Sequence, residues 1–264
     1  MQPISRSNLS RIACLKHKKY RDEEQAYLIS GLFAVKTALE STDIHVTDIL
    51  LRQDRLDWLQ TIPINAGKMR RATVHQLSAP QFQKISDEKN PQGIALVARK
   101  PSLPVDPIVI DDPLVIYLDQ INDPGNLGTI IRTSAWFGVR TLLLSPRSAD
   151  PFQPKVVRSS AGLISHMRCL EEFSPLHLNQ LITAGDYRII GASEKAEQRI
   201  DHFDFKSSQK YCLVFGSEAR GISPELQRLI QQPLAIPRYG VGQSLNLAVS
   251  VALFLYQRSQ NKSA

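Results

Sequence analysis

The stretch LVIYLDQINDPGNLGTIIRTSAWFGV, residues 114–139, contains a run typical of a buried strand, then a turn and a helical pattern. Residues 114–121 are mostly apolar, as in a strand covered on both faces of a sheet. Asp-Pro-Gly favours a turn, and the apolar residues of 127–138 recur at helical spacing. A strand followed directly by a helix predicts an α/β fold. The helix also carries Arg132, a charged side chain that needs a structural or chemical reason.

The same alternation continues through the second half of the sequence. The strands are apolar along their whole length and helices separate them, which predicts a parallel sheet with helices on both faces. We expect strands at 141–146, 166–171, 187–193, 210–217 and 234–238, and helices at 155–164, 174–185, 223–231 and 244–259.

Helices and strands also alternate in the first hundred residues, which predicts a small, separate α/β domain at 1–100. We expect helices at 26–40, at 55–62 and from 80, and strands at 45–52, 72–78 and 93–99. Four prolines within residues 100–113 then exclude a regular helix. We therefore assign residues 101–112 to an interdomain linker and residues 113–264 to a second domain.

Composition limits the possible classes of protein. The longest apolar run, LNLAVSVALFLY at 245–256, has 12 residues, whereas a membrane helix needs roughly 20. The three cysteines are far apart and predict neither a zinc site nor a disulfide framework. Cys212, within an apolar run, is expected to be a buried hydrophobic residue. A reducing cytoplasm is the simplest location.

Nearly all of the net charge of +7 comes from residues 1–21, which contain six Lys or Arg and no acidic residue. Such a segment suits a surface for RNA phosphates, a solvated tail or a mitochondrial presequence. Leu9, Ile12 and Leu15 recur among the basic residues at helical spacing, which favours a docked helix with a basic, RNA-binding outer face. The candidate RNA-binding residues are Arg11, Lys16, Lys18, Lys19 and Arg21.

Three stretches follow the ends of predicted strands: residues 119–139, 213–223 and 234–252. Ligands bind at that edge of open α/β sheets, so we expect the three stretches to line one site. GVGQSLN at 240–246 does not indicate a dinucleotide fold, because neither a strand nor a ribose-binding carboxylate follows at the required spacing. Walker A, H-E-x-x-H and G-x-S-x-G sequences are absent.

In their order and spacing, these stretches resemble the three motifs of the SpoU family in the SPOUT superfamily. Members of this TrmH-like family are RNA ribose 2′-O-methyltransferases that use S-adenosylmethionine. Residues 4–41 and 90–98 are similar to the start and the end of the N-terminal substrate-binding domain, of ribosomal-protein L30e-like fold, that some members carry. Ser30, Thr129 and Ser134 depart from the usual residues but leave the motif core intact.

The resemblance implies a C-terminal parallel-sheet domain with a deep trefoil knot, preceded by a small α/β L30e-like domain. It also implies a homodimer with catalytic residues near the subunit interface, and chemistry without a metal. The expected activity is S-adenosylmethionine-dependent 2′-O-methylation of structured RNA, with 23S-type ribosomal RNA favoured over transfer RNA. The alternatives are a transfer-RNA methyltransferase, a resistance methyltransferase acting on ribosomal RNA, and a non-catalytic RNA-binding or ribosome assembly factor.

By position in the motifs, the resemblance implies that Gly216, Ile236 and Leu245 contact the cofactor. Without the resemblance, simpler structural roles explain the presence of these three residues. Gly216 suits a turn, and Ile236 and Leu245 suit core packing. The choice between these roles depends on where the three residues lie in the fold.

The resemblance places Asn126, Arg132, Glu218, Ser244 and Asn246 in the active site. From the residues alone, Asn126 suits a turn and Ser244 suits the N-cap of the last helix. Asn246, expected one residue inside that helix, has less structural reason to be there. Glu218 alone suits an ordinary loop carboxylate, whereas the resemblance implies an active-site residue that orders its loop or pairs with an arginine.

Arg132 lies six residues after Asn126, close to two helical turns, and is expected to point back toward the strand ends. The resemblance implies that it activates the ribose 2′-hydroxyl. The pKa of arginine, above about 12, makes a literal base awkward, whereas a fixed guanidinium can stabilise the developing alkoxide. A structural ion pair with Asp123 or Glu218 is the alternative.

Overall fold

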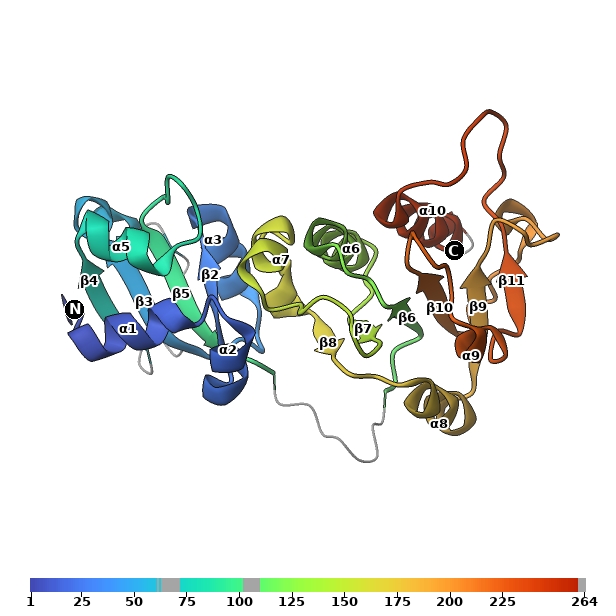
Figure 1. Ribbon diagram of the computed structural model, residues 1–264, viewed down its shortest axis with the longest axis horizontal. Helices are drawn as coiled ribbons and strands as arrows, with labels where there is room; N and C mark the ends of the chain where they lie inside the picture. The colour runs from blue at the N-terminus through green and yellow to red at the C-terminus, as the bar shows by residue number, and fades with distance from the viewer. Residues whose placement is uncertain (61, 63–71, 102–109, 261–264) are drawn as a thin grey trace. The chain divides into compact units, whose positions relative to one another are not determined.

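The computed structural model describes residues 1–60, 62, 72–101 and 110–260. The chain forms two compact units (Figure 1). Unit 1 comprises Met1–Ser102 together with Asp150–His166, and unit 2 comprises Leu103–Ala149 together with Met167–Ala264. Most of the linker predicted at 101–112 lies outside the described residues. The domain boundaries inferred from the sequence stay a proposal.

Unit 1 is built on a mixed five-stranded sheet with the order β1-β4-β3-β5-β2. Its strands are β1 (Gln2–Pro3), β2 (Ala26–Ser30), β3 (Val46–Arg52), β4 (Thr73–Leu77) and β5 (Ile94–Arg99). The pairs β1/β4 and β4/β3 are parallel, whereas β5 is antiparallel to both β3 and β2. The helical segments from the first part of the chain are α1 (Arg6–Cys14), α2 (Lys18–Glu24), α3 (Leu32–Glu40), η1 (Gln53–Gln60) and α5 (Ala79–Ile85).

The helix predicted at 26–40 is wrong over its first residues, because Ala26–Ser30 form strand β2. β2 pairs along its whole length with β5, and four of its five residues are buried. A continuous apolar run of this kind does not show the alternation of a half-exposed strand, so its periodicity resembles that of a buried helix. Gly31 then turns the chain at a φ of 97° and begins α3, a conformation open to glycine at little cost.

The N-terminal basic segment docks on unit 1 as predicted, but it forms two helices, α1 and α2, instead of one. Ser5 caps α1 by accepting a hydrogen bond from the backbone N–H of Asn8. Leu9, Ile12 and Leu15 are buried in the core of unit 1. Their helical spacing therefore anchors the segment, because burying each such side chain contributes roughly 1.5–3 kcal/mol.

Residues 150–166 leave the sheet of unit 2 and pack within unit 1. They form α7 (Pro154–Ser159) and the short η2 (Leu163–His166). Asp150, at the start of the segment, is almost fully buried and accepts hydrogen bonds from Nε and Nη2 of the equally buried Arg21, at 3.0 and 2.5 Å. The buried ion pair thus fixes the point where the chain enters unit 1.

Replacing Asp150 by alanine is expected to lower the free energy of unfolding by about 3–5 kcal/mol, because Arg21 would keep its charge without a buried counter-ion. Urea unfolding measures this. Asp87→Ala is a matched control, because Asp87 pairs with Arg158 in the same unit but at the surface. That loss should cost no more than about 1 kcal/mol. Equal effects of the two substitutions would contradict the prediction.

Unit 2 contains an all-parallel six-stranded sheet with the order β11-β9-β10-β6-β7-β8. The strands are β6 (Leu114–Asp119), β7 (Thr141–Leu144), β8 (Arg168–Leu170), β9 (Tyr187–Ala192), β10 (Lys210–Gly216) and β11 (Gln232–Leu234). The prediction of a parallel sheet in this half is confirmed. β11 is shorter than expected, and it is an edge strand, where its Pro233 is tolerated. Strand order alone does not define chain threading, so the knot stays a prediction.

The helical segments of unit 2 are α6 (Pro124–Trp136), α8 (Pro175–Gly185), η3 (Ile200–His202), α9 (Pro224–Gln227) and α10 (Leu247–Gln260). α6 and α10 pack against each other, although they are far apart in sequence. This packing brings the first and third motif stretches together.

The two cysteines of unit 2 are core residues. Cys212 lies at the centre of β10 with no exposed surface, and Cys169 is also buried. Burial raises the pKa of both thiols far above the ordinary range. Neither side chain is therefore suited to act as a nucleophile, which confirms the apolar role expected for Cys212.

In the described part of the chain, helices fall short of the length and hydropathy that a membrane span requires.

Candidate active site

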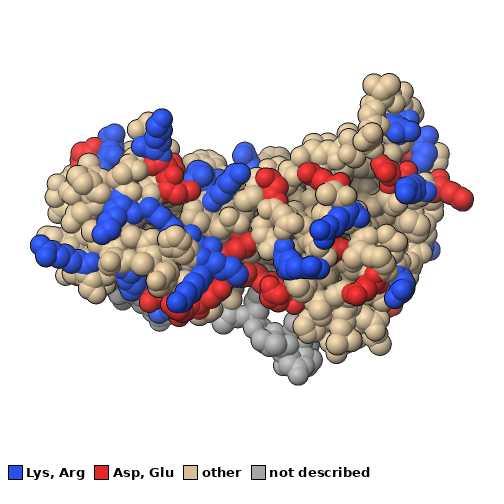
Figure 2. Space-filling view, viewed as in Figure 1, with Lys and Arg blue, Asp and Glu red and all other residues tan. Residues whose placement is uncertain are grey.

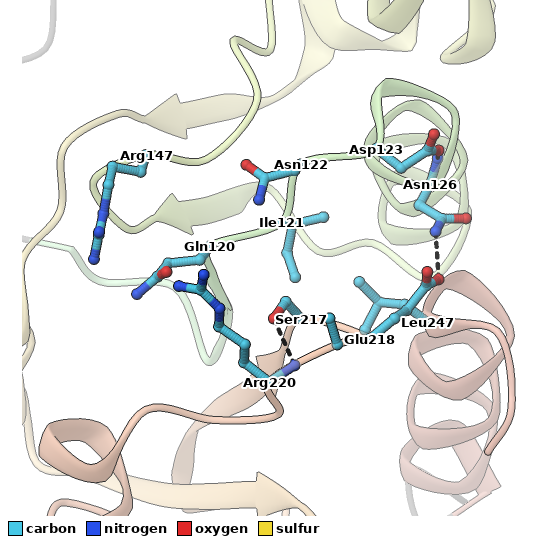
Figure 3. Close-up of a pocket in the computed structure, with 11 residues that line it drawn as sticks. Gln120, Ile121, Asn122, Asp123, Asn126, Arg147, Ser217, Glu218, Arg220 and Leu247 are labelled. Atoms are coloured by element: carbon cyan, nitrogen blue, oxygen red, sulfur yellow. Dashed lines mark hydrogen bonds between the residues drawn. The ribbon is translucent and has the colours of Figure 1, made fainter. Parts of the chain in front are cut away.

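The C-terminal ends of β6, β7 and β10 border one cavity of about 560 Å³ (Figure 3). This volume suits a small-molecule site, and this edge of a parallel sheet is where ligands bind. The cavity is lined by Gln120, Ile121, Asn122, Asp123, Asn126, Arg147, Ser217, Glu218, Ala219, Arg220 and Leu247. All three motif stretches contribute residues to it.

Asn126 joins the first motif stretch to the second. Its backbone N–H donates to Oδ1 of Asp123, the N-cap of α6, at 2.7 Å. Its side-chain Nδ2 donates to Oε1 of Glu218, in the loop after β10, at 2.6 Å. Figure 3 shows this amide and carboxylate facing each other at the α6 end of the cavity. Glu218 therefore pairs with an amide here rather than with an arginine.

Asn246 caps α10 and extends this network to the third stretch. Its Oδ1 accepts hydrogen bonds from the backbone N–H groups of Ala248 and Val249, at 2.9 and 3.4 Å. Its Nδ2 donates to Oδ1 of Asn126 at 2.9 Å. Because the cap needs the oxygen of Asn246, the nitrogen must face Asn126, and the nitrogen of Asn126 must then face Glu218. The helix N-terminus thereby sets the direction of both amides.

The expected N-cap role of Ser244 is wrong, because α10 begins at Leu247 and Asn246 is its cap. Ser244 lies two residues earlier, in an exposed loop. Ser and Asn are both good N-cap residues, so the sequence SLN did not decide between them. Asn246 thus has the structural role that the sequence had not revealed.

Substitutions at Asn246 should separate capping from the amide network. Asn246→Ser keeps an N-cap acceptor but loses the donor to Asn126, so we expect nearly unchanged unfolding in urea and a loss of roughly tenfold or more in the methyl transfer that the SpoU resemblance predicts. Asn246→Ala should lose the same activity and also about 1 kcal/mol of unfolding free energy. Parental activity in the serine variant would show that the amide network is dispensable.

Arg132 lies on α6 but does not line the cavity. Its side chain is exposed, and across the described residues it has no hydrogen bond or ion pair. Six residues advance a helix by about 600°, which is roughly 240° past one full turn, so Arg132 and Asn126 face different directions. Within one protomer the structure brings Arg132 neither to the strand ends nor into an ion pair with Asp123 or Glu218.

Comparison with known proteins agrees with this fold. Residues 113–256, more than half of the chain, match the SpoU rRNA Methylase family. The chain belongs to this family. Residues 7–96 match the MRM3-like substrate binding domain, so the substrate-binding region precedes the SpoU region in the chain.

Individual relatives resemble the chain over almost its full length. The 23S rRNA guanosine 2′-O-methyltransferase RlmP of Bacillus subtilis is 29% identical over 92% of each chain. A putative RNA methyltransferase of the TrmH family from Porphyromonas gingivalis has a TM-score of 0.84 at 29% identity, covering 97% of this chain and 98% of that one. The SpoU methyltransferase AviRb of Streptomyces viridochromogenes, in complex with AdoMet, gives 0.82 at 22% identity over 97% and 98%, a likeness in fold alone.

The three residues that the SpoU resemblance assigns to the cofactor lie outside the cavity lining. Gly216 ends β10 and directly precedes the lining residue Ser217. Ile236 lies past the end of β11 rather than within it, and Leu245 is half exposed before α10 begins. Both belong to the loop between β11 and α10, in which residues 238–246 are all exposed. The three assignments stay predictions.

The N-terminal basic residues differ in their availability for RNA. Lys18 and Lys19 are exposed on α2, and each pairs with an acid one turn away, Asp22 and Glu23 respectively. Lys16 donates to a backbone carbonyl, so its charge is not neutralised by that contact. Acidic side chains are interspersed among the basic ones on the face shown in Figure 2. This surface is a mixed one rather than a continuous basic patch.

Two of the predicted RNA-binding arginines have structural partners. The RNA-binding role predicted for Arg21 is wrong, because Arg21 is buried and its guanidinium donates hydrogen bonds to Asp150 and to the backbone carbonyl of Leu15. This position does not leave it available for RNA. Arg11 is partly exposed and pairs with Asp48 at 3.1 Å.

Five polar residues in the lining were not singled out from the sequence: Gln120, Asn122, Arg147, Ser217 and Arg220. Arg147 follows β7, whose end was not among the three stretches considered. The sequence feature that could have revealed Arg147 was its position just past an apolar strand, at the same sheet edge as the motifs. Gln120 and Arg220 lay inside motif stretches but matched no expected role.

Proposed function

We propose that this SpoU family member transfers a methyl group from S-adenosylmethionine to a ribose 2′-oxygen of ribosomal RNA of the 23S type. The observation that carries the proposal is the directed network of Asn246, Asn126 and Glu218, which joins the three motif stretches at the cavity. The similarity to RlmP supports the choice of 23S ribosomal RNA.

The negatively charged groups at the α6 end of the cavity suit the positively charged sulfonium of this cofactor. Asp123 and Glu218 supply carboxylates there, whereas the arginines of the lining, Arg147 and Arg220, lie at the other end (Figure 3). Carboxylates favour a nearby sulfonium cation electrostatically. When bound, S-adenosylmethionine supplies an electrophilic methyl group.

The residues of the network can orient the ribose. Asn126 uses one amide hydrogen for Glu218 and keeps the other, which can donate to the 2′-oxygen. Oε2 of Glu218 can accept the hydrogen of the 2′-hydroxyl as its oxygen becomes nucleophilic. A guanidinium beside that oxygen stabilises the developing negative charge, and we assign this role to Arg132.

A homodimer reconciles this role with the exposed position of Arg132. α10 presents the apolar residues Val249, Leu253 and Tyr256 to solvent at i, i+4 and i+7, and Trp136 on neighbouring α6 is 85% exposed. Exposed apolar surface of this kind favours association. We propose that two copies pair through the α6–α10 face, so that Arg132 of one copy enters the cavity of the other.

We further propose that unit 1 contributes to RNA binding through the exposed lysines of α2, in the cytoplasm. Its match to a substrate binding domain supports this role. Lys18 and Lys19 retain exposed ammonium groups, which suit contacts with RNA phosphates.

The deciding experiment incubates the protein with methyl-labelled S-adenosylmethionine and unmodified transcripts of 23S ribosomal RNA and transfer RNA, followed by digestion to nucleosides. Label in a 2′-O-methylnucleoside of the ribosomal RNA supports the proposal. Label confined to transfer RNA would make the chain a transfer-RNA methyltransferase. RNA binding without cofactor binding or label would indicate a non-catalytic RNA-binding factor.

A further inference from the structure

The cavity has two chemically different ends (Figure 3). Asp123, Asn126 and Glu218 gather beside α6 and α10. Arg147 and Arg220 extend on the opposite side, one on each side of Gln120. Nothing in the proposed chemistry of the amide end uses these two arginines.

The backbone holds Arg147 and Gln120 in place. Arg147 has a φ of 69° and Gln120 a φ of 53°, in the left-handed region that non-glycine residues seldom adopt. The backbone N–H of Gln120 donates to Oγ of Ser145 at 2.7 Å, which joins the loop after β6 to the loop after β7. Backbone strain retained at a cavity is typical of a functional position.

Arg220 is presented by a closed turn in the loop after β10. The backbone N–H of Gly221 donates to the carbonyl of Ser217 at 2.8 Å, and the N–H of Arg220 donates to Oγ of Ser217 at 3.3 Å. Figure 3 shows the guanidinium of Arg220 reaching back toward Gln120. The turn therefore aims the arginine into the cavity.

Neither guanidinium is neutralised by the residues that the structure describes. Arg147 and Arg220 are exposed, and their side chains have no hydrogen bond or ion pair there. Glu218, two residues before Arg220, is used by Asn126 instead. A pair of free guanidinium groups in a cavity favours an oxyanion, which arginine binds in a bidentate manner.

We propose that Arg147 and Arg220 bind a backbone phosphate of the RNA strand, next to the nucleotide that is methylated. This inference rests on the proposed function. The carboxylate of the cofactor is a less suitable anion, because an ammonium group adjoins it and the carboxylates of the lining are at the other end. A phosphodiester carries a single negative charge with no attached cation.

Arg147→Gln and Arg220→Gln test this site, with Arg140→Gln as the matched control. Arg140 is also exposed, but it precedes β7, whereas Arg147 follows it, so the two arginines lie at opposite edges of the sheet. RNA affinity is measured with an unmodified 23S ribosomal RNA transcript and S-adenosylhomocysteine over a range of salt concentrations. Cofactor affinity is measured by calorimetry without RNA.

Each cavity variant is expected to weaken RNA binding roughly tenfold, as for the loss of one charge-assisted hydrogen-bonding group. The salt slope, which is the steepness with which the logarithm of the RNA binding constant falls with the logarithm of the salt concentration, should decrease by about 0.7–0.9 for each phosphate that the variant no longer neutralises. Cofactor affinity should remain parental, and Arg140→Gln should leave RNA affinity and the salt slope unchanged. Arg147→Gly provides a folding control, because glycine relaxes the left-handed backbone; it should lose RNA affinity while its melting temperature does not fall.

Two outcomes overturn the inference. Weaker cofactor binding with parental RNA affinity would assign the arginines to the cofactor carboxylate, and unchanged RNA affinity and salt slope in both glutamine variants would remove the phosphate site. Failure of the proposed function is recognised separately, because RNA binding is measured without methyl transfer. A protein that binds RNA through these arginines but never methylates it retains the phosphate site and loses the proposed activity.

Discussion

Gly216→Ala is expected to reduce methyl transfer by about 100-fold or more, because small misplacements in an active site have effects of that size. A Cβ at Gly216 would lie 2.0 Å from the backbone carbon of Gly221 and 2.2 Å from the backbone nitrogen of Ile222. Backbone atoms cannot rotate away as a flexible side chain can. The loop after β10 must therefore move, and it carries Glu218.

The surrounding bonds allow little room for that movement. Gly221 closes the turn onto Ser217, and the N–H of Ser223 donates to the buried Asp119 at 2.8 Å. Displacing the loop breaks one of these bonds or separates Glu218 from Asn126. Steady-state kinetics and urea unfolding measured together show both consequences.

Gly240→Ala is the control for this prediction. Gly240 lies in the loop between β11 and α10, its φ is not in the left-handed region, and an added Cβ would have no atom within 4 Å. We expect parental folding and activity for this variant. Near-parental activity of Gly216→Ala would show that the loop tolerates displacement and that its position does not control the reaction.

The sheet of unit 2 was predictable because its strands are apolar along their length, as burial on both faces requires. The same property misled the prediction for Ala26–Ser30, where only Ser30 and Gly31 separate the apolar run of a buried strand from that of α3. The sequence contained Gly31 at that boundary. Its φ of 97° identifies the boundary only once the backbone is known.

The convergence of the three motif stretches on one cavity was predictable from the sequence, whereas the catalytic roles of Asn126, Glu218 and Asn246 stay predictions. The direction of their hydrogen bonds was not predictable, because it depends on α10 beginning at Leu247 and on the packing of α10 against α6. Arg147 was missed because its place in the cavity lining depends on the tertiary placement of the β7 end beside β6. These are contacts between segments distant in sequence, which local pattern does not encode.

The buried pairing of Arg21 shows the same limit. The residues before it are mainly basic, which favoured an exposed RNA-binding surface, but its partner Asp150 lies 129 residues away. A single buried carboxylate changes the role of an arginine from ligand binding to structural support.

Arg132→Ala is expected to lower kcat about 100- to 1000-fold, the effect of removing one donor that stabilises a developing oxyanion. Cofactor binding should remain parental, because the role proposed for Arg132 is toward the ribose 2′-oxygen and not toward the cofactor. Arg132→Lys keeps the charge but loses the planar fork of the guanidinium, so it should recover only part of the rate. Rapid-quench single-turnover measurements separate the chemical step from RNA binding. Parental turnover in Arg132→Ala would remove Arg132 from the mechanism.

A mixed-dimer experiment decides which copy supplies Arg132. Arg132→Ala and Glu218→Gln should each be inactive alone, because each damages both sites of its dimer. If Arg132 enters the cavity of the other copy, a mixed dimer has one site with both defects and one intact site. With half of all dimers mixed, an equal mixture should recover about a quarter of parental activity, given a two-fold symmetric interface.

The mixed-dimer experiment gives an equally clear result if Arg132 does not enter the cavity of the other copy. If Arg132 acts on the cavity of its own chain, every site in the mixed dimer carries one defect, and the mixture stays inactive. Differently tagged copies, purified through both tags, show that mixed dimers have formed before activity is measured. An inactive, doubly tagged dimer would refute the supply of Arg132 from the second copy. Because Arg132 is exposed, its action on the cavity of its own chain would then require a movement of α6 within one protomer.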